Sequence, residues 1–187
     1  MDSFRSALLS GYIHEFHRLK SLADKGMAQV NPENFFSRSD AEANSIALLV
    51  KHMAGNMRSR WTDFLTTDGE KPDRHRDEEF EIREGDTREK LLEDWDQSWE
   101  VLFDTLQSLS ESDLEETITI REEEHTVWQA ILRQISHYAY HVGQIVMLAK
   151  ELRSGEWQSL SIPRGKSEEF RKNPKSYLGE QRSDKHS

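Results

Sequence analysis

The sequence of 187 residues contains no cysteine. This absence excludes disulfide bonds, metal sites built on thiolates and any catalytic thiol supplied by the protein itself. Thiol chemistry in this protein would therefore need a small-molecule thiol. The absence also agrees with a location in the cytoplasm, where proteins do not depend on disulfides for stability.

Long hydrophobic runs are also missing. No uninterrupted apolar stretch approaches the roughly 18 residues that a membrane span needs. The first 20 residues, MDSFRSALLSGYIHEFHRLK, are too polar for a signal peptide. We therefore expect a cytoplasmic protein that does not engage a membrane.

Positive charge is in short supply. The chain has 25 lysines and arginines against 35 acidic residues, so its formal net charge is −10 and its isoelectric point is near 5.3. A protein that binds the phosphate backbone of nucleic acids needs a basic face, so this excess of acidic residues argues against nucleic acid as a partner. A small-molecule substrate is the partner that we expect.

The length and composition fit one domain with a full-sized core. Hydrophobic residues make up 35% of the chain, and the mean hydropathy is −0.84, as in amphipathic helical proteins with a large solvated surface. We assign residues 1–155 to a helical domain. Residues 156–187 are predicted to be a wrapping C-terminal segment and a polar tail rather than a second domain.

Apolar residues recur at steps of three and four in four stretches of the chain, which predicts four amphipathic helices. These stretches are residues 3–30, 45–65, 87–109 and 126–153. Four such helices joined by long connections predict an all-α fold, a four-helix bundle. Residues 117–127 alternate enough to suggest a short β-hairpin before the last helix. The charged segment 66–86 is predicted to be a long exposed connection, of the kind that often covers a site.

The last predicted helix carries His137 and His141, which are four residues apart. This spacing puts two imidazoles on one helix face, about 6 Å apart at the backbone, as two ligands of one metal ion must be. Winding the sequence on a helix places both at the flank of the apolar arc. His52 has the same flanking position on the second predicted helix, beside Asn56. Packed histidines bonded to neighbours are the alternative interpretation.

The combination of His52 in NSIALLVKHMAGNMRSRW with the later HYAYHVGQIVMLAKEL resembles the DinB/YfiT-like family of metal-binding helical bundles, over roughly residues 4–152. The resemblance implies that His52, His137 and His141 bind one divalent metal ion. Zinc or nickel is expected, with manganese or iron as alternatives. The resemblance also implies that a homodimer is possible.

The activity implied by the resemblance is a metal-dependent transfer reaction, in which a low-molecular-weight thiol is the co-substrate and attacks a small electrophile. The nucleophile would be a metal-bound thiol or water, and no nucleophile from the protein is expected. Two alternatives remain open: a hydrolase that uses metal-bound water, and a non-catalytic stress-response module with a structural metal.

Four further residues are candidates for contacts around this site. Asn56 and Gln144 lie within one turn of the predicted ligands and are expected to orient them or to bind substrate. Arg60 is a candidate partner for a substrate carboxylate. Glu15 is the candidate fourth ligand if the metal is structural and its site closed.

Overall fold

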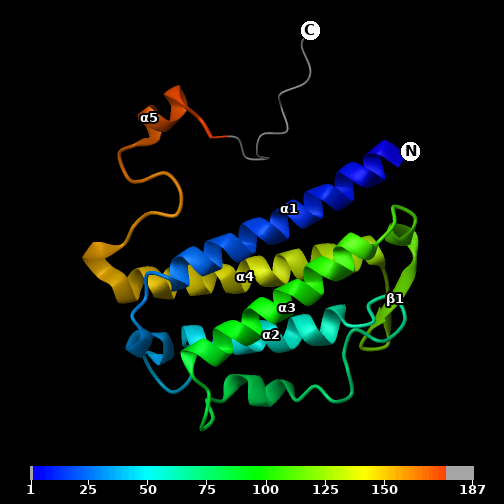
Figure 1. The fold of residues 1–187 in the computed structure, drawn as a ribbon, viewed down its shortest axis with the longest axis horizontal. Coiled ribbons are helices and arrows are strands. Elements are labelled where there is room, and N and C mark those ends of the chain that lie inside the picture. The colour runs from blue at the N-terminus through cyan, green and yellow to red at the C-terminus, as the bar shows by residue number, and fades with distance from the viewer. Residues whose placement is uncertain (1, 176–187) are drawn as a thin grey trace.

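The structure is a computed structural model that describes residues 2–175. Within this range, four long helices form the body of the molecule (Figure 1): α1 (Asp2–Met27), α2 (Ile46–Trp61), α3 (Arg88–Ser108) and α4 (Val127–Arg153). α1 packs chiefly against α4, and α2 against α3 and α4. The predicted all-α bundle is confirmed.

Shorter elements join or follow these helices. Four are single 3-10 turns, η1 (Pro32–Phe36), η2 (Arg76–Phe80), η3 (Asp113–Glu115) and η4 (Ser154–Glu156), and one is the short helix α5 (Ser167–Lys172). The predicted hairpin is also present, as antiparallel strands β1 (Thr117–Ile120) and β2 (Glu123–Thr126).

Side-chain caps fix the starts of three of the long helices. Ser45 Oγ accepts from the Leu48 amide, 3.2 Å away, and so satisfies one unpaired N–H of α2. Thr126 and Gln129 bond reciprocally at the start of α4, as expected for a capping box. At the start of α3, Thr87 Oγ1 accepts from the Lys90 amide at 3.2 Å.

Aromatic side chains from all four long helices meet in the centre of the bundle. The Phe16 ring lies 5.7 Å from the Trp61 ring and 5.9 Å from the Tyr138 ring, centroid to centroid. Trp99 of α3 completes the group, 5.8 Å from Tyr138. All four side chains are essentially inaccessible to solvent, and their large buried areas hold the helices that carry the site in place.

One aspartate ties the hairpin to the body of the protein. The hairpin turn puts Arg121 and Glu122 at positive φ, 57° and 65°, which non-glycine residues adopt only at a cost in energy. Their amides donate to the Asp68 carboxylate, at 2.9 and 2.8 Å. Asp68 therefore stabilises a strained turn and joins it to the segment after α2.

Among the described residues of the C-terminal segment, the first few contact the bundle. Trp157 is half-buried against the core, and the amide of Gln158 donates to the Gln29 side chain at 2.8 Å. Figure 1 shows α5 standing apart from the long helices. Of the predicted wrapping segment and polar tail, residues 156–187, the part from residue 176 onward lies outside the described residues.

In the part of the chain that the structure describes, no helix combines the length and the hydrophobicity that crossing a membrane requires.

Candidate metal centre

The structure brings the three predicted histidines together. His52 on α2 and His141 on α4 are buried, and His137, one turn before His141, is half-buried. One ring nitrogen from each lies within 4.8 Å of the other two. The His52 ring centroid is 4.9 Å from that of His141 and 5.5 Å from that of His137. These distances place three potential ligand atoms around one point.

The donor set fits a divalent metal ion. The Nε2 atoms of His137 and His141 are 3.1 Å apart, close to the roughly 3.3 Å between two ligand nitrogens of a tetrahedral zinc site. The Nδ1 atom of each of the three rings faces an oxygen acceptor. With the ring protons on Nδ1, the Nε2 lone pairs point toward one another with no proton between them. A bound cation would relieve the repulsion between these lone pairs.

The acceptor at His52 comes from the segment between α2 and α3, which runs along α2 on the side away from α1 (Figure 1). His52 Nδ1 lies 2.8 Å from Glu79 Oε2, and the Arg74 guanidinium holds both Glu79 oxygens at 2.8 and 2.9 Å. Burial raises the pKa of the Glu79 carboxyl, but the bonds from His52 and Arg74 outweigh it and lower the pKa. Glu79 is therefore an ionised acceptor that orients the His52 ring.

The sequence prediction missed Glu79, because it placed the whole of residues 66–86 among exposed residues. Glu79 is in fact buried, and the Phe80 ring lies 4.7 Å from the His52 ring. Gly55 was an available signal, since a glycine inside a helix often marks a close approach. A Cβ at Gly55 would collide with Oε1 of Glu79 and lie 2.8 Å from its Cδ.

Side-chain amides on α4 orient the other two rings. Gln144 Oε1 lies 2.8 Å from His141 Nδ1, and Gln134 Oε1 lies 3.4 Å from His137 Nδ1. Burial, with His141 and His52 close by, lowers the pKa of His137 to about 3, and burial also lowers the pKa of His141. Both rings are thus neutral at pH 7, which is the form that binds metal.

Asn56 is held in position by a chain of hydrogen bonds through the core. Trp61 Nε1 donates to the Tyr138 hydroxyl at 3.1 Å, and that hydroxyl donates to Asn56 Oδ1 at 3.0 Å. Because its oxygen is occupied, Asn56 keeps its NH₂ group as a donor for the pocket that it lines.

A pocket of about 560 Å³ opens beside the three histidines. It lies between α2, α4, the η2 segment and the hairpin turn, and a small molecule would fit it. The side chains that line it are polar, basic or aromatic: Asn44, His52, Asn56, Arg60, Arg74, Arg76, Phe80, Arg121, Arg133, Gln134, His137, Tyr140, His141 and Gln144. Predicted residues Asn56, Gln144 and Arg60 thus all belong to this site.

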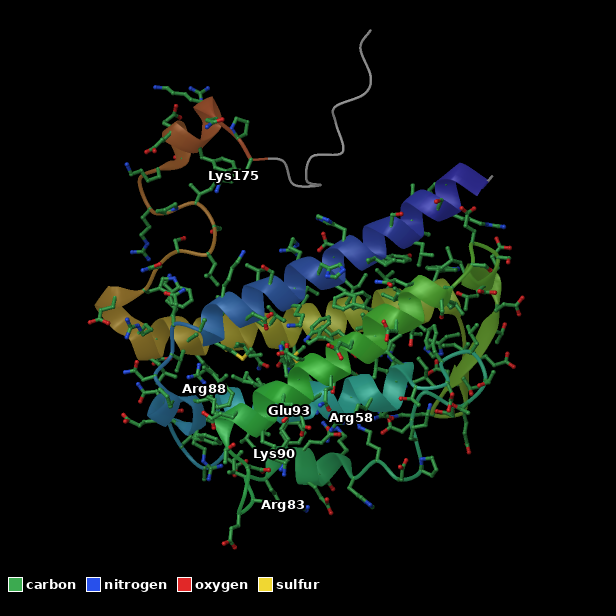
Figure 2. All side chains as sticks on the ribbon, in the orientation of Figure 1. Arg58, Arg83, Arg88, Lys90, Glu93 and Lys175 are labelled. Atoms are coloured by element: carbon green, nitrogen blue, oxygen red, sulfur yellow. The ribbon has the colours of Figure 1, made fainter. Side chains whose placement is uncertain are left out.

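Glu15 lies elsewhere. It is on α1, where it forms an ion pair with Arg18 at 2.9 Å, and it is not among the residues that line the pocket. Arg58 lies two residues from both Asn56 and Arg60, on another face of α2, and donates to Ser98 of α3 at 3.0 Å. It is labelled in Figure 2.

Comparison with known proteins gives a family without an assigned activity. No curated protein and no solved structure matches the chain significantly. A family model described as a protein of unknown function, DUF1572, matches residues 3–166 and so covers all four long helices and the three histidines. The chain therefore belongs to the DUF1572 family.

Proposed function

We propose that this protein is a divalent-metal-dependent enzyme of the DinB type, which transfers a small-molecule thiol to an electrophilic substrate. The observation that carries the proposal is the arrangement of the histidines. Three ring nitrogens converge while the opposite nitrogen of each ring faces an acceptor. The likeness of the sequence to the DinB/YfiT-like family, with its lone histidine and later HxxxHxGQ, supports the same function.

The surroundings favour a catalytic over a structural metal. Structural zinc sites have four protein ligands, whereas catalytic sites keep one position open. Among residues 2–175, the group of potential ligands contains three histidines and no fourth residue. Glu79 is committed to His52 and Arg74, and the histidines border a pocket.

The side chains that line the pocket favour a thiol over water as the nucleophile. Metal-dependent hydrolases often use a carboxylate as general base, but no aspartate or glutamate is among the described residues that line this pocket. A thiol has an ordinary pKa of about 8.5 against 15.7 for water, so it needs far less help to ionise. A divalent ion would supply positive charge that lowers this pKa further.

The residues of the protein would perform the remaining tasks. His52, His137 and His141 would hold the ion, with Glu79, Gln134 and Gln144 fixing their rings. The Asn56 amide would donate to the substrate, and Phe80, which packs on His52, would limit the access of water. Zinc or nickel suits three imidazoles best, with manganese or iron as alternatives. A cytoplasmic location, where small thiols are abundant and reduced, is part of the proposal.

An activity assay tests the chemistry. Metal-loaded protein is supplied with a chromogenic electrophile, with and without a low-molecular-weight thiol, and in parallel with ester and amide substrates. We expect consumption of the electrophile that requires thiol and metal and is lost in His137→Ala, but kept in His75→Ala, whose side chain is exposed. Turnover of an ester or amide without thiol, and none of the electrophile with thiol, would identify the hydrolase instead.

A further inference from the structure

The pocket beside the histidines is basic, although the protein is acidic. The formal net charge of the chain is −10, yet five arginines and no carboxylate are among the described residues that line the pocket. Such a concentration of one sign of charge in a concave site attracts ligands of the opposite sign. The basic lining of the pocket therefore indicates the charge of the substrate.

Some of this charge already has protein partners. Arg74 bonds to Glu79 with Nε and Nη2 and to Glu70 with Nη1. Glu70 is shared, because it also lies 3.2 Å from Arg121 and 3.6 Å from Arg60. Two carboxylates, Glu70 and Glu79, face the three guanidinium groups of Arg60, Arg74 and Arg121, so an excess of positive charge remains at this end of the pocket.

Arg60 is the residue in this group with the fewest partners. Its side chain is only 3% exposed, and its Nε and Nη1 atoms are buried without a hydrogen-bond partner. An arginine always carries its charge, and burying donors of a charged group unpaired costs considerable free energy. Because Arg60 lines the pocket and its Nη2 lies 3.6 Å from Glu70, an anionic ligand in the pocket would give this guanidinium a closer acceptor.

Helix geometry places Arg60 and Arg133 at the same end of the pocket. His52, Asn56 and Arg60 follow one another at intervals of four along α2, and Arg133, His137 and His141 do so along α4. Arg60 follows His52 along α2, whereas Arg133 precedes His137 and His141 along α4. Both line the same pocket, and their charges are close enough to interact.

The spacing also sets the length of a ligand. Arg60 is two turns from His52, about 12 Å of helix rise, and long helical side chains lean toward the N-terminus, here toward His52. A molecule of several heavy atoms could thus bind Arg60 with one end and reach the histidines with the other. The pocket volume of about 560 Å³ agrees with this size.

We infer that the substrate of this pocket carries an oxyanion group, a carboxylate or a phosphate, which Arg60 binds with the help of Arg133 while the reactive end faces the histidines. The inference rests on the proposed function, because it names the substrate class of the same site. The five arginines of the lining disfavour a cationic substrate.

Calorimetric titration tests the inference with two probes, inorganic phosphate and succinate, at constant ionic strength set with potassium chloride. Wild-type protein should bind at least one of these probes, and the probe that binds shows whether the oxyanion group is a phosphate or a carboxylate. Loss of a charge-assisted hydrogen bond of about 1.5–3 kcal/mol predicts at least a tenfold weaker affinity in Arg60→Gln. Arg171→Gln, on exposed α5, should bind like the wild type.

Because Arg60 is buried, Arg133→Gln provides a second variant at an exposed residue, whose guanidinium lies 3.1 Å from His125 Nε2. The Arg133→Gln variant should bind the same probe more weakly than the wild type, without a change in thermal stability. Binding of neither probe at millimolar concentration, or equal binding by wild type and both variants, would overturn the inference. Each sample is also titrated with zinc: zinc binding without anion binding defeats this inference alone, and anion binding without zinc binding defeats the proposed function alone.

Discussion

At the scale of single residues, the site depends on side chains that orient other side chains. His137 and His141 are neutral because burial lowers the pKa of each ring, and each of the three imidazoles is held by an acceptor on the nitrogen opposite the converging one. Glu79 is the strongest of these acceptors, since it is ionised and fixed by two bonds from Arg74. Its removal should therefore affect metal affinity more than fold.

Glu79→Gln should weaken metal binding by about 10- to 100-fold, the usual effect of losing a residue that orients a metal-bound histidine. Competition with a chromogenic chelator measures the affinity. Glu78→Gln is the matched control, because Glu78 is exposed and pairs with exposed Arg83. If the two variants kept the same affinity as the wild type, Glu79 would have no part in orienting His52.

At the scale of elements, the periodic pattern was sufficient to predict four helices, and the flanking positions of His52, His137 and His141 were also visible in it. Intervals of four residues along α2 and α4 put the functional side chains on one face of each helix. The contact between His52 and Glu79 was not predictable in this way. It joins residues 27 apart through an irregular segment, whose charged composition looks like that of a solvated loop.

Gly55→Ala tests how closely that segment must approach α2. Alanine favours helix by up to about 1 kcal/mol over glycine, but here the added Cβ would displace the Glu79 carboxylate. We expect weaker metal affinity and faster proteolysis between residues 66 and 86. Gly11→Ala is the control, because no atom lies within 4 Å of the added Cβ. Faster cleavage in both variants alike, or in neither, would contradict this interpretation.

Asp68 gives the hairpin a dependence on pH. Partial burial raises the pKa of its carboxyl, but bonds from the Glu122, Glu70 and Arg121 amides outweigh this and lower the pKa from 3.8 to about 2. Between these values the unfolded chain binds more protons than the native one. The stabilisation by Asp68 is therefore complete above pH 3.8 and is lost as the pH falls toward 2.

Asp68→Asn should accordingly lower the free energy of unfolding at pH 7, by about 1 kcal/mol after allowance for solvent screening. Urea denaturation at pH 7 and at pH 2.5 measures the difference from wild type. The difference should shrink at the lower pH. A difference that is the same at both values would show that the carboxylate charge does not hold the turn.

At the scale of the whole molecule, the fold and the site are separable. The aromatic core of Phe16, Trp61, Trp99 and Tyr138 packs the four helices without the metal ligands, and the caps fix the helix starts independently. The metal-free protein should therefore stay folded. Metal binding adds stability only by mass action, as for any ligand of the native state, in contrast to zinc domains that unfold on chelation.

The most direct test of the central claim is elemental analysis of protein purified without an affinity tag and dialysed against a trace of zinc. The account predicts about one metal ion per chain in the wild type. It predicts none in His137→Ala/His141→Ala, whose circular dichroism should stay that of a folded helical bundle. A wild-type protein that retains no zinc, nickel, manganese or iron, or a double variant that retains as much as the wild type, would contradict it.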